Sequence, residues 1–240
     1  LKGEFPPIVA RQGWQKLFPA FAKAGEALGT IAPWVVKRTG LDPSVEVLAG
    51  AHDSNANLYR YKAAGMASHT VLSTGTWMIG FNRGRPLEGF IEARAMVANV
   101  DVDGEPIAST LTMTGREYAI LAGDKPVSDA RALNLVPDIL ARGTIALPSF
   151  VDDDGAFPKS GGNGKITGPQ PNSPEERGAV AALYAAFSAN LCLDVLGSTT
   201  PIVIDGGFAT NQAFGHLLAA LRPDQPVSMS RSKDGTALGA

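Results

Sequence analysis

A carboxylate stands between a strand-like run and a helical run early in the chain. Val45 to Ala49 is apolar and rich in β-branched residues, and the turn from Gly50 to Asp53 follows it directly. Ligand sites in α/β sheets lie beyond the carboxyl ends of strands, so this turn could offer the Asp53 carboxylate to a bound ligand. Asp53 could also cap the helix predicted from residue 54 to residue 64, a role that aspartate often fills. Both roles stay open at this stage.

His52 precedes this carboxylate and raises the question of a catalytic His-Asp pair. Adjacent residues in a chain usually point in different directions, so we expect His52 to shape the pocket instead. His69 and His216 stand alone, and Cys192 is the single cysteine. This spacing does not suit a zinc site, and no other metal-ligand set is predicted.

A second turn offers hydroxyl groups and backbone amides to an anion. The residues from Ser73 to Trp77 join two strand-like runs, which predicts a hairpin. Glycine at position 75 lets the backbone approach an anion, and the amides of Gly75 and Thr76 could bind phosphate oxygens together with the hydroxyls of Thr74 and Thr76. An ordinary hairpin turn is the alternative.

A third turn has the strand, glycine, helix order of a nucleotide site. The apolar run from Pro201 to Ile204 leads into Asp205-Gly206-Gly207, and Thr210 is predicted to cap the helix that follows. Two glycines allow a flat or anionic group to lie against the backbone, although a tight turn would also need them. The run is neither the dinucleotide G-x-G-x-x-G pattern nor a Walker loop.

A fourth candidate is the helix start at Thr114-Gly115-Arg116-Glu117. Thr114 is predicted as the N-cap and Glu117 as its capping-box partner. A glycine at a helix N-terminus can also receive an anion. The structural and the binding interpretations of Gly115 are therefore both kept.

Taken together, the turn at residues 50–53, the turn at residues 73–77 and the run from Asp205 to Asn211 resemble the FGGY carbohydrate kinases. These enzymes are ATP-dependent kinases of sugars and polyols, and the order and spacing of the motifs match along nearly the whole chain. The resemblance implies an α/β fold of the actin-like, ribonuclease-H-like type. It implies Asp53 as the catalytic base, with His52 beside it at the sugar. Its implied nucleotide contacts are Thr74, Gly75, Thr76, Gly115, Gly206, Gly207 and Asn211.

The resemblance also predicts the domain organisation and the ligands. The family opens with an Asp-x-Gly-Thr motif in a large N-terminal domain, and this sequence does not contain that motif at its start. We therefore expect a fragment: residues 1–67 end the sugar-binding domain, and residues 68–240 form most of the nucleotide-binding domain. ATP and Mg²⁺ are the implied cofactors and a ketose is the expected substrate. We expect the fragment alone to be inactive.

Composition narrows the remaining possibilities. With 240 residues, 45% of them hydrophobic, the chain can build one large or two modest cores. A net charge of −2 gives no basic face, so no nucleic-acid partner is expected. No apolar run approaches the length that a membrane span needs, and one cysteine suits a reducing cytoplasm. A homodimer stays open.

The remaining elements follow from periodicity and from turn residues. Apolar residues from Trp14 to Leu28 recur at helical spacing and predict a helix that begins near Pro19 and ends at Gly29. Trp14 and Trp34 are expected in a core. The acidic run 152–155 lacks the alternation of a calcium loop and is predicted to be solvated. Further predicted strands lie at 69–73, 77–81, 94–102, 105–111 and 144–150, and further helices at 33–39, 128–142 and 174–197.

Two other function classes remain open. One is an actin-like ATPase module, which would not respond to a sugar. The other is a non-catalytic sugar sensor, which would tolerate Asp53→Asn. Release of ADP that depends on a sugar and on Asp53 would distinguish a kinase from both.

Overall fold

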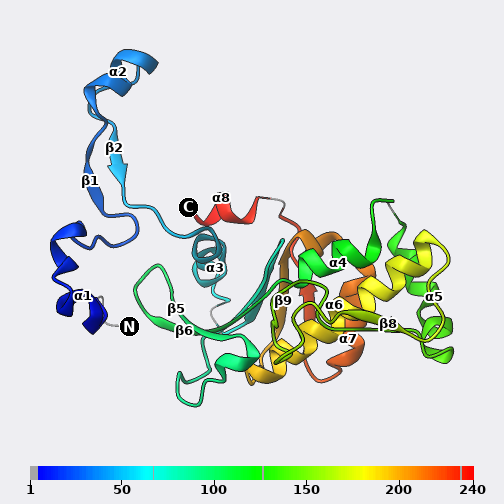
Figure 1. Ribbon diagram of the computed structural model, residues 1–240. Coiled ribbons are helices and arrows are strands. Elements are labelled where there is room, and N and C mark those ends of the chain that lie inside the picture. The colour runs from blue at the N-terminus through cyan, green and yellow to red at the C-terminus, as the bar shows by residue number, and fades with distance from the viewer. Residues whose placement is uncertain (1–4, 67, 126, 233) are drawn as a thin grey trace.

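A computed structural model describes residues 5–66, 68–125, 127–232 and 234–240. Its main body is a mixed six-stranded sheet covered by helices, and a slender N-terminal extension projects from it (Figure 1). The architecture is the α/β arrangement predicted from the sequence.

The sheet has the strand order β10-β9-β3-β4-β6-β5. β3 pairs in parallel with β9 and β9 with β10, while the β3-β4 hairpin, β6 and β5 continue the sheet in antiparallel fashion. The carboxyl ends of the three parallel strands therefore meet at one edge. The strands are β3 (Thr70–Thr74), β4 (Met78–Asn82), β5 (Met96–Val100), β6 (Pro106–Thr112), β9 (Ile202–Gly206) and β10 (Val227–Met229).

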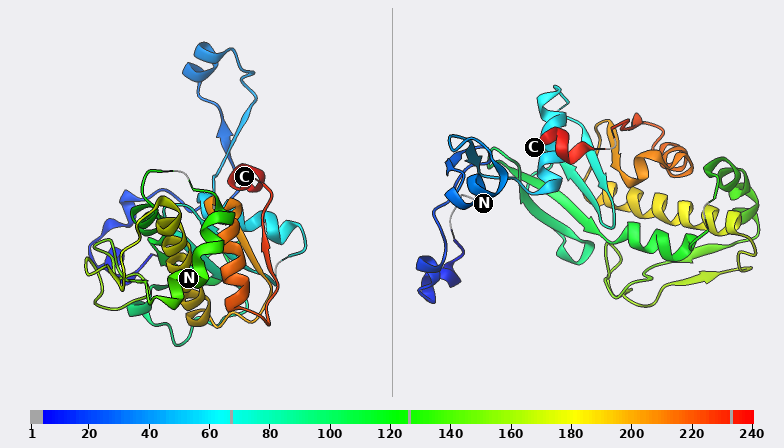
Figure 2. Two further views of the ribbon diagram at one scale, coloured as in Figure 1. Left: turned by 90° about the vertical axis from the view of Figure 1, so that its right-hand side faces the viewer. Right: turned by 90° about the horizontal axis from the view of Figure 1, so that it is seen from above.

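Each face of the sheet has its own helices, because side chains alternate along a strand. Leu72 and Ile204 pack in the core formed with α6 and α7. Val71 and Val203 face the other way and pack against Leu58 of α3. Figure 2 shows α3 on one side of the sheet and α6 on the other. The helices of the body are α3 (Asp53–Ala63), α4 (Thr114–Ala122), α5 (Asp129–Ala141), α6 (Pro174–Val195), α7 (Gln212–Leu221) and α8 (Gly235–Gly239).

The central helix α6 begins as the sequence indicates. The Ser173 hydroxyl accepts a hydrogen bond from the Glu176 amide at 3.1 Å, and Pro174 occupies the first turn. This helix corrects the estimate of apolar length, since its 22 residues are long and apolar enough to cross a membrane. However, 72% of its apolar 18-residue window is buried inside the protein, as in the core helix of a globular domain.

The N-terminal extension differs from the prediction. The helix expected from Pro19 to Gly29 is absent from the described residues; a 3-10 helix at Trp14–Leu17 is followed by strand β1 (Ala27–Thr30), which pairs with β2 (Glu46–Leu48). Pro19 and Gly25 interrupt the helical pattern, and strand pairing satisfies the backbone instead. α1 (Pro7–Arg11) was not predicted, whereas α2 (Pro33–Thr39) ends at Gly40 as expected.

The burial predicted for two tryptophans is wrong. Trp14 is 45% exposed and Trp34 is 67% exposed. Both lie in the extension, which projects from the body (Figure 1) and gives these side chains little to pack against. The helical spacing of apolar residues therefore did not predict which of these side chains are buried.

The predicted capping box at α4 is also wrong. Met113 is the N-cap residue, and the Thr114 hydroxyl pairs at 2.8 Å with that of Thr112. Glu117 turns inward, where its carboxylate accepts hydrogen bonds from the Phe150 amide and the Tyr184 hydroxyl, both at 2.7 Å. A buried carboxylate needs such partners, and this requirement overrides the local capping signal.

The segment after α5 is a small ribbon with a long loop. β7 (Ile145–Leu147) is shorter than the predicted strand and pairs with β8 (Lys165–Thr167), which was not predicted. Between them, the Asp154 carboxylate accepts hydrogen bonds from the amides of Lys159 and Gly161 at 2.7 and 2.8 Å. The acidic run therefore orders its own loop.

Candidate active site

Two adjoining cavities lie at the carboxyl ends of the parallel strands. The larger, here called the acid cavity, has a volume of about 760 Å³, and the smaller, the glycine cavity, about 320 Å³. Gly75 lines both. The acid cavity includes His52, Asp53, Thr74, Gly75, Thr76, Trp77, Asp205, Gly206 and Asp234. The glycine cavity includes Gly75, Gly115, Tyr118, Asp129, Gly207, Phe208, Thr210 and Asn211. All sequence-predicted site residues therefore line one cavity or the other.

Asp53 is the first residue of α3, and its carboxylate opens into the acid cavity. Its side chain is 71% exposed. Its Oδ1 accepts hydrogen bonds from the Ser54 amide at 2.6 Å and from the Ser54 hydroxyl at 3.3 Å. The carboxylate is thus held by the start of its own helix, while it remains accessible to a bound molecule.

His52 differs from the expectation in two respects. It, and not Asp53, is the N-cap residue of α3, since its Nδ1 lies 3.3 Å from the Ser54 amide. The same Nδ1 lies 3.0 Å from Asp53 Oδ1, so the two side chains do meet. Nδ1 can accept from the amide only without a proton and can donate to the carboxylate only with one, so the two contacts exclude each other.

The phosphate-type turn is partly occupied by the protein itself. The Thr74 hydroxyl donates to the Asp205 carbonyl and accepts from the Phe208 amide at 2.9 Å. The Gly75 amide donates to the Trp77 carbonyl at 2.8 Å. Thr76 is exposed, and among the described residues no protein group binds its amide or hydroxyl. Thr76 is therefore the member of this turn best able to bind an anion.

Three of the four predicted glycines differ in what the fold requires of them. A Cβ at Gly115 would lie closer than 3.0 Å to the Gly75 carbonyl oxygen, and one at Gly206 would lie as close to that of Thr74. Both glycines are therefore needed for close backbone approach. A Cβ at Gly207 would meet only the Thr74 oxygen, at 3.7 Å. The fold leaves room there, on the wall of the glycine cavity.

Asn211 caps α7, a role that was predicted for Thr210. A 3-10 turn, Gly207–Thr210, separates β9 from α7, so Asn211 and not Thr210 caps the helix. Its Oδ1 accepts from the Phe214 amide, and its Nδ2 donates to the Tyr118 hydroxyl, both at 2.9 Å. Asn211 lines the glycine cavity with its amide group already bonded.

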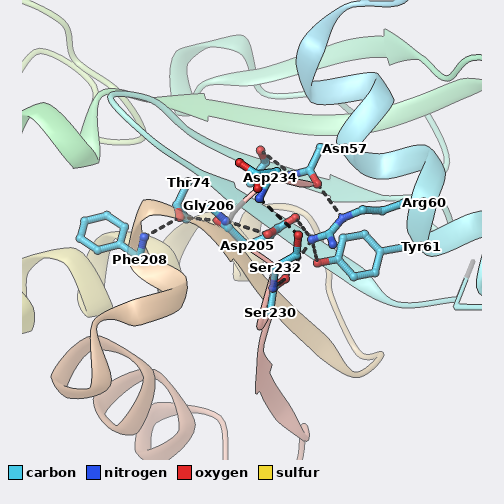
Figure 3. Close-up of polar contacts among 11 residues, drawn as sticks. Asn57, Arg60, Tyr61, Thr74, Asp205, Gly206, Phe208, Ser230, Ser232 and Asp234 are labelled. Carbon is cyan, nitrogen blue, oxygen red and sulfur yellow. Dashed lines mark hydrogen bonds and ion pairs between the residues drawn. The ribbon is translucent and has the colours of Figure 1, made fainter. Parts of the chain in front are cut away.

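A buried polar network that was not predicted from the sequence lies behind the acid cavity. Arg60 of α3 forms an ion pair with Asp205 at the end of β9, and both contact residues around them (Figure 3). Burial alone would raise the pKa of Asp205, but hydrogen bonds from Arg60, from the Gly206 amide and from Asn57 lower it. Asp205 is therefore ionised in the folded protein. The position of Asp205 directly after an apolar strand could have indicated it as a site residue, whereas no local sequence signal indicated Arg60.

The acid cavity is lined by three carboxylates that could ligate a metal ion, those of Asp53, Asp205 and Asp234. No group of three or more His, Cys, Asp or Glu side chains in the described part of the chain is arranged to hold a metal ion. Of the acid-cavity carboxylates, Asp205 is already paired with Arg60.

Comparison with known proteins identifies the family. The family model described as "Carbohydrate kinase FGGY, C-terminal domain" matches residues 66–240, which is more than half of the chain. The chain belongs to the FGGY carbohydrate kinase family. None of the curated proteins compared with it matches. The FGGY match covers the whole six-stranded sheet and both glycine-rich turns.

Solved structures agree with this assignment. A carbohydrate kinase from Novosphingobium aromaticivorans is 38% identical, with a TM-score of 0.83 over 99% of this chain. A ligand-bound xylulose kinase and a gluconate kinase, both from Lactobacillus acidophilus, are 17% identical with TM-scores of 0.74 and 0.71, over 98% and 92% of this chain. The last two show the shared actin-like fold. This chain spans 54%, 50% and 47% of the respective proteins, so it corresponds to about half of each.

Proposed function

We propose that the protein transfers the γ-phosphoryl group of ATP to a hydroxyl group of a sugar. One observation carries the proposal: an exposed carboxylate and a glycine-containing turn line the same cavity, next to a second cavity walled by Gly207. Both volumes lie in the range of about 300–1,000 Å³ that is usual for small-molecule sites. Membership of a carbohydrate kinase family supports the same reaction class.

In this mechanism, positioning and charge stabilisation dominate, as is general for phosphoryl transfer. Asp53 accepts the proton of the attacking sugar hydroxyl, and the Ser54 amide holds that carboxylate in place. Thr76 binds the transferred phosphate, and the rest of the nucleotide lies in the glycine cavity along Gly207. Mg²⁺, when bound with ATP, neutralises charge on the phosphate oxygens.

The substrate class and the domain roles are part of the proposal. A ketose is the proposed acceptor, and part of its pocket comes from outside the 240 residues, since this chain spans only 54% of the solved carbohydrate kinase. Residues 1–67 close the sugar-binding domain and residues 68–240 form the nucleotide-binding domain, while α3 packs on the sheet of the latter. A cytoplasmic location suits an ATP-dependent reaction and the free Cys192 thiol.

The test is an ADP-release screen of the full-length protein against ketoses and polyols. Asp53→Asn should lower kcat by about 10²–10⁴-fold, the range for general base catalysis. Asp224→Asn is the matched control, because Asp224 is exposed and lines none of the cavities described above. The 240-residue chain alone should not phosphorylate the sugar.

Three results would contradict the proposal in different ways. Release of ADP without any sugar dependence would indicate an actin-like ATPase module. A sugar-binding protein unaffected by Asp53→Asn would be a sensor. Ketose-dependent ADP release by the isolated 240 residues would show that these residues are sufficient for the reaction.

A further inference from the structure

The helix that carries Asp53 also carries an arginine that reaches the glycine turn. Arg60 lies seven residues after Asp53, about 10 Å along the axis of α3 at 1.5 Å per residue. Its side chain is 14% exposed and that of its partner Asp205 is 1% exposed. A buried charge in this position must be paired, and here the pair joins two elements that line one cavity.

The contacts of Arg60 extend to three segments of the chain. Beside the ion pair with Asp205, its Nη2 donates to the Ser230 hydroxyl at 2.9 Å, just after β10. Within α3 its Nε donates to Asn57 Oδ1 at 2.9 Å, and Nη2 to the Tyr61 hydroxyl at 2.6 Å. Figure 3 shows the guanidinium between the helix and the ends of both strands. Nη2 carries two hydrogens and lies near three acceptors, so it can donate fully to only two of them at once, while Nε bonds independently to Asn57.

Asp205 connects Arg60 to the phosphate-type turn through further hydrogen bonds. Its Oδ1 accepts from the Gly206 amide at 2.8 Å, and its carbonyl accepts from the Thr74 hydroxyl. Thr74 in turn accepts from the Phe208 amide at 2.9 Å. One continuous series of bonds therefore runs from α3 through Asp205 to both glycine-containing turns.

Apolar packing holds α3 on the sheet independently of this network. Leu58 and Tyr61 pack with Val71, Phe81 and other sheet residues. Such packing fixes contact between helix and sheet, whereas directional bonds fix how the helix sits along the strand ends. We propose that Arg60 is a positioning residue, which sets the distance between the Asp53 carboxylate and the nucleotide by tying α3 to Asp205.

The inference rests on the proposed function, and the experiment separates the two. In the full-length protein, Arg60→Met and Arg60→Lys are measured alone and in combination with Asp53→Asn. Arg60→Met should lower kcat by about 10–100-fold, since a displacement of about 1 Å can cost that much. In the Asp53→Asn background the same change should lower kcat by less than about twofold, because residues that act through one group are not additive.

Arg142→Met is the matched control for loss of an ion pair. Arg142 bonds to Glu176 at 2.8 Å, is 29% exposed and lines neither cavity. This variant should leave kcat unchanged even where it lowers the urea midpoint. Arg60→Lys keeps the charge but loses the fork, and it should fall between Arg60→Met and the wild type.

Each outcome has a distinct meaning. An equal loss of kcat from Arg60→Met in both backgrounds, or no loss with Asp53 present, overturns the inference. Full activity of Asp53→Asn overturns the proposed function instead. If Arg60→Met does not fold, the same comparison with Arg60→Lys decides, since it retains a cation beside Asp205.

Discussion

Replacing each residue of the Gly206-Gly207 pair by alanine separates a glycine that the fold requires from one that a ligand requires. Gly206 has a φ of 81° and a ψ of −145°, a region that costs other residues about 1–3 kcal/mol. A Cβ there would also overlap the Thr74 carbonyl oxygen, and relief of such overpacking costs about 1–3 kcal/mol. Gly206→Ala should therefore lower the free energy of unfolding by about 2–6 kcal/mol, a large part of a typical total of about 5–15 kcal/mol.

Gly207→Ala is the matched variant. Its Cβ would lie at an ordinary distance of 3.7 Å from the Thr74 oxygen, so the free energy of unfolding should change by no more than about 0.5 kcal/mol. Its methyl group would enter the glycine cavity, and the affinity for ATP should fall.

Urea unfolding followed by far-UV circular dichroism measures the first quantity, and calorimetric titration of the full-length protein with ATP measures the second. Equal urea midpoints for the two variants would refute the close approach of β9 to β3. Unchanged ATP affinity in Gly207→Ala would remove Gly207 from the nucleotide site.

Three further predictions concern buried ionisable groups. Burial raises the pKa of Glu117. The wild type should therefore lose stability relative to Glu117→Gln as the pH rises through that pKa. A difference in unfolding free energy between the two proteins that stays constant from about pH 4 to about pH 7 contradicts this. Burial would raise the pKa of Asp101, but the Arg83 hydrogen bond and nearby amides lower it. Asp101→Asn should therefore cost about 3 kcal/mol at neutral pH, a loss that shrinks as the pH falls through that lowered pKa, and an equal loss in acid would disprove the pairing. Burial raises the pKa of the Cys192 thiol to about 11, so a thiol reagent should label it only after denaturation; fast labelling of the folded protein would show otherwise.

Local signals in the sequence predicted most of the body of the molecule. The strands predicted at 94–102 and 105–111 are formed as β5 and β6, and the helix predicted at 174–197 is formed as α6. Such signals act within a few residues, through dihedral preferences and capping hydrogen bonds. They also indicated the three turns that line the two cavities.

Several predictions that depended on distant partners were wrong. Glu117 was expected to cap its own helix, and it bonds instead to Tyr184, 67 residues away. Trp34 was expected in a core, and the described residues leave it exposed. The type of a side chain predicts what kind of partner it needs, but not which residue supplies that partner.

The sequence by itself determined the family motifs, the order of strands and glycine turns, and the placement of a carboxylate at the start of α3. Only the tertiary structure decided that the Thr74 hydroxyl forms hydrogen bonds with Asp205 and Phe208. It also decided that Arg60 pairs with a carboxylate 145 residues away. The physical reason is the range of the interactions. Backbone conformation depends mainly on neighbouring residues, whereas a buried charge meets its partner only after the sheet has brought separate segments together.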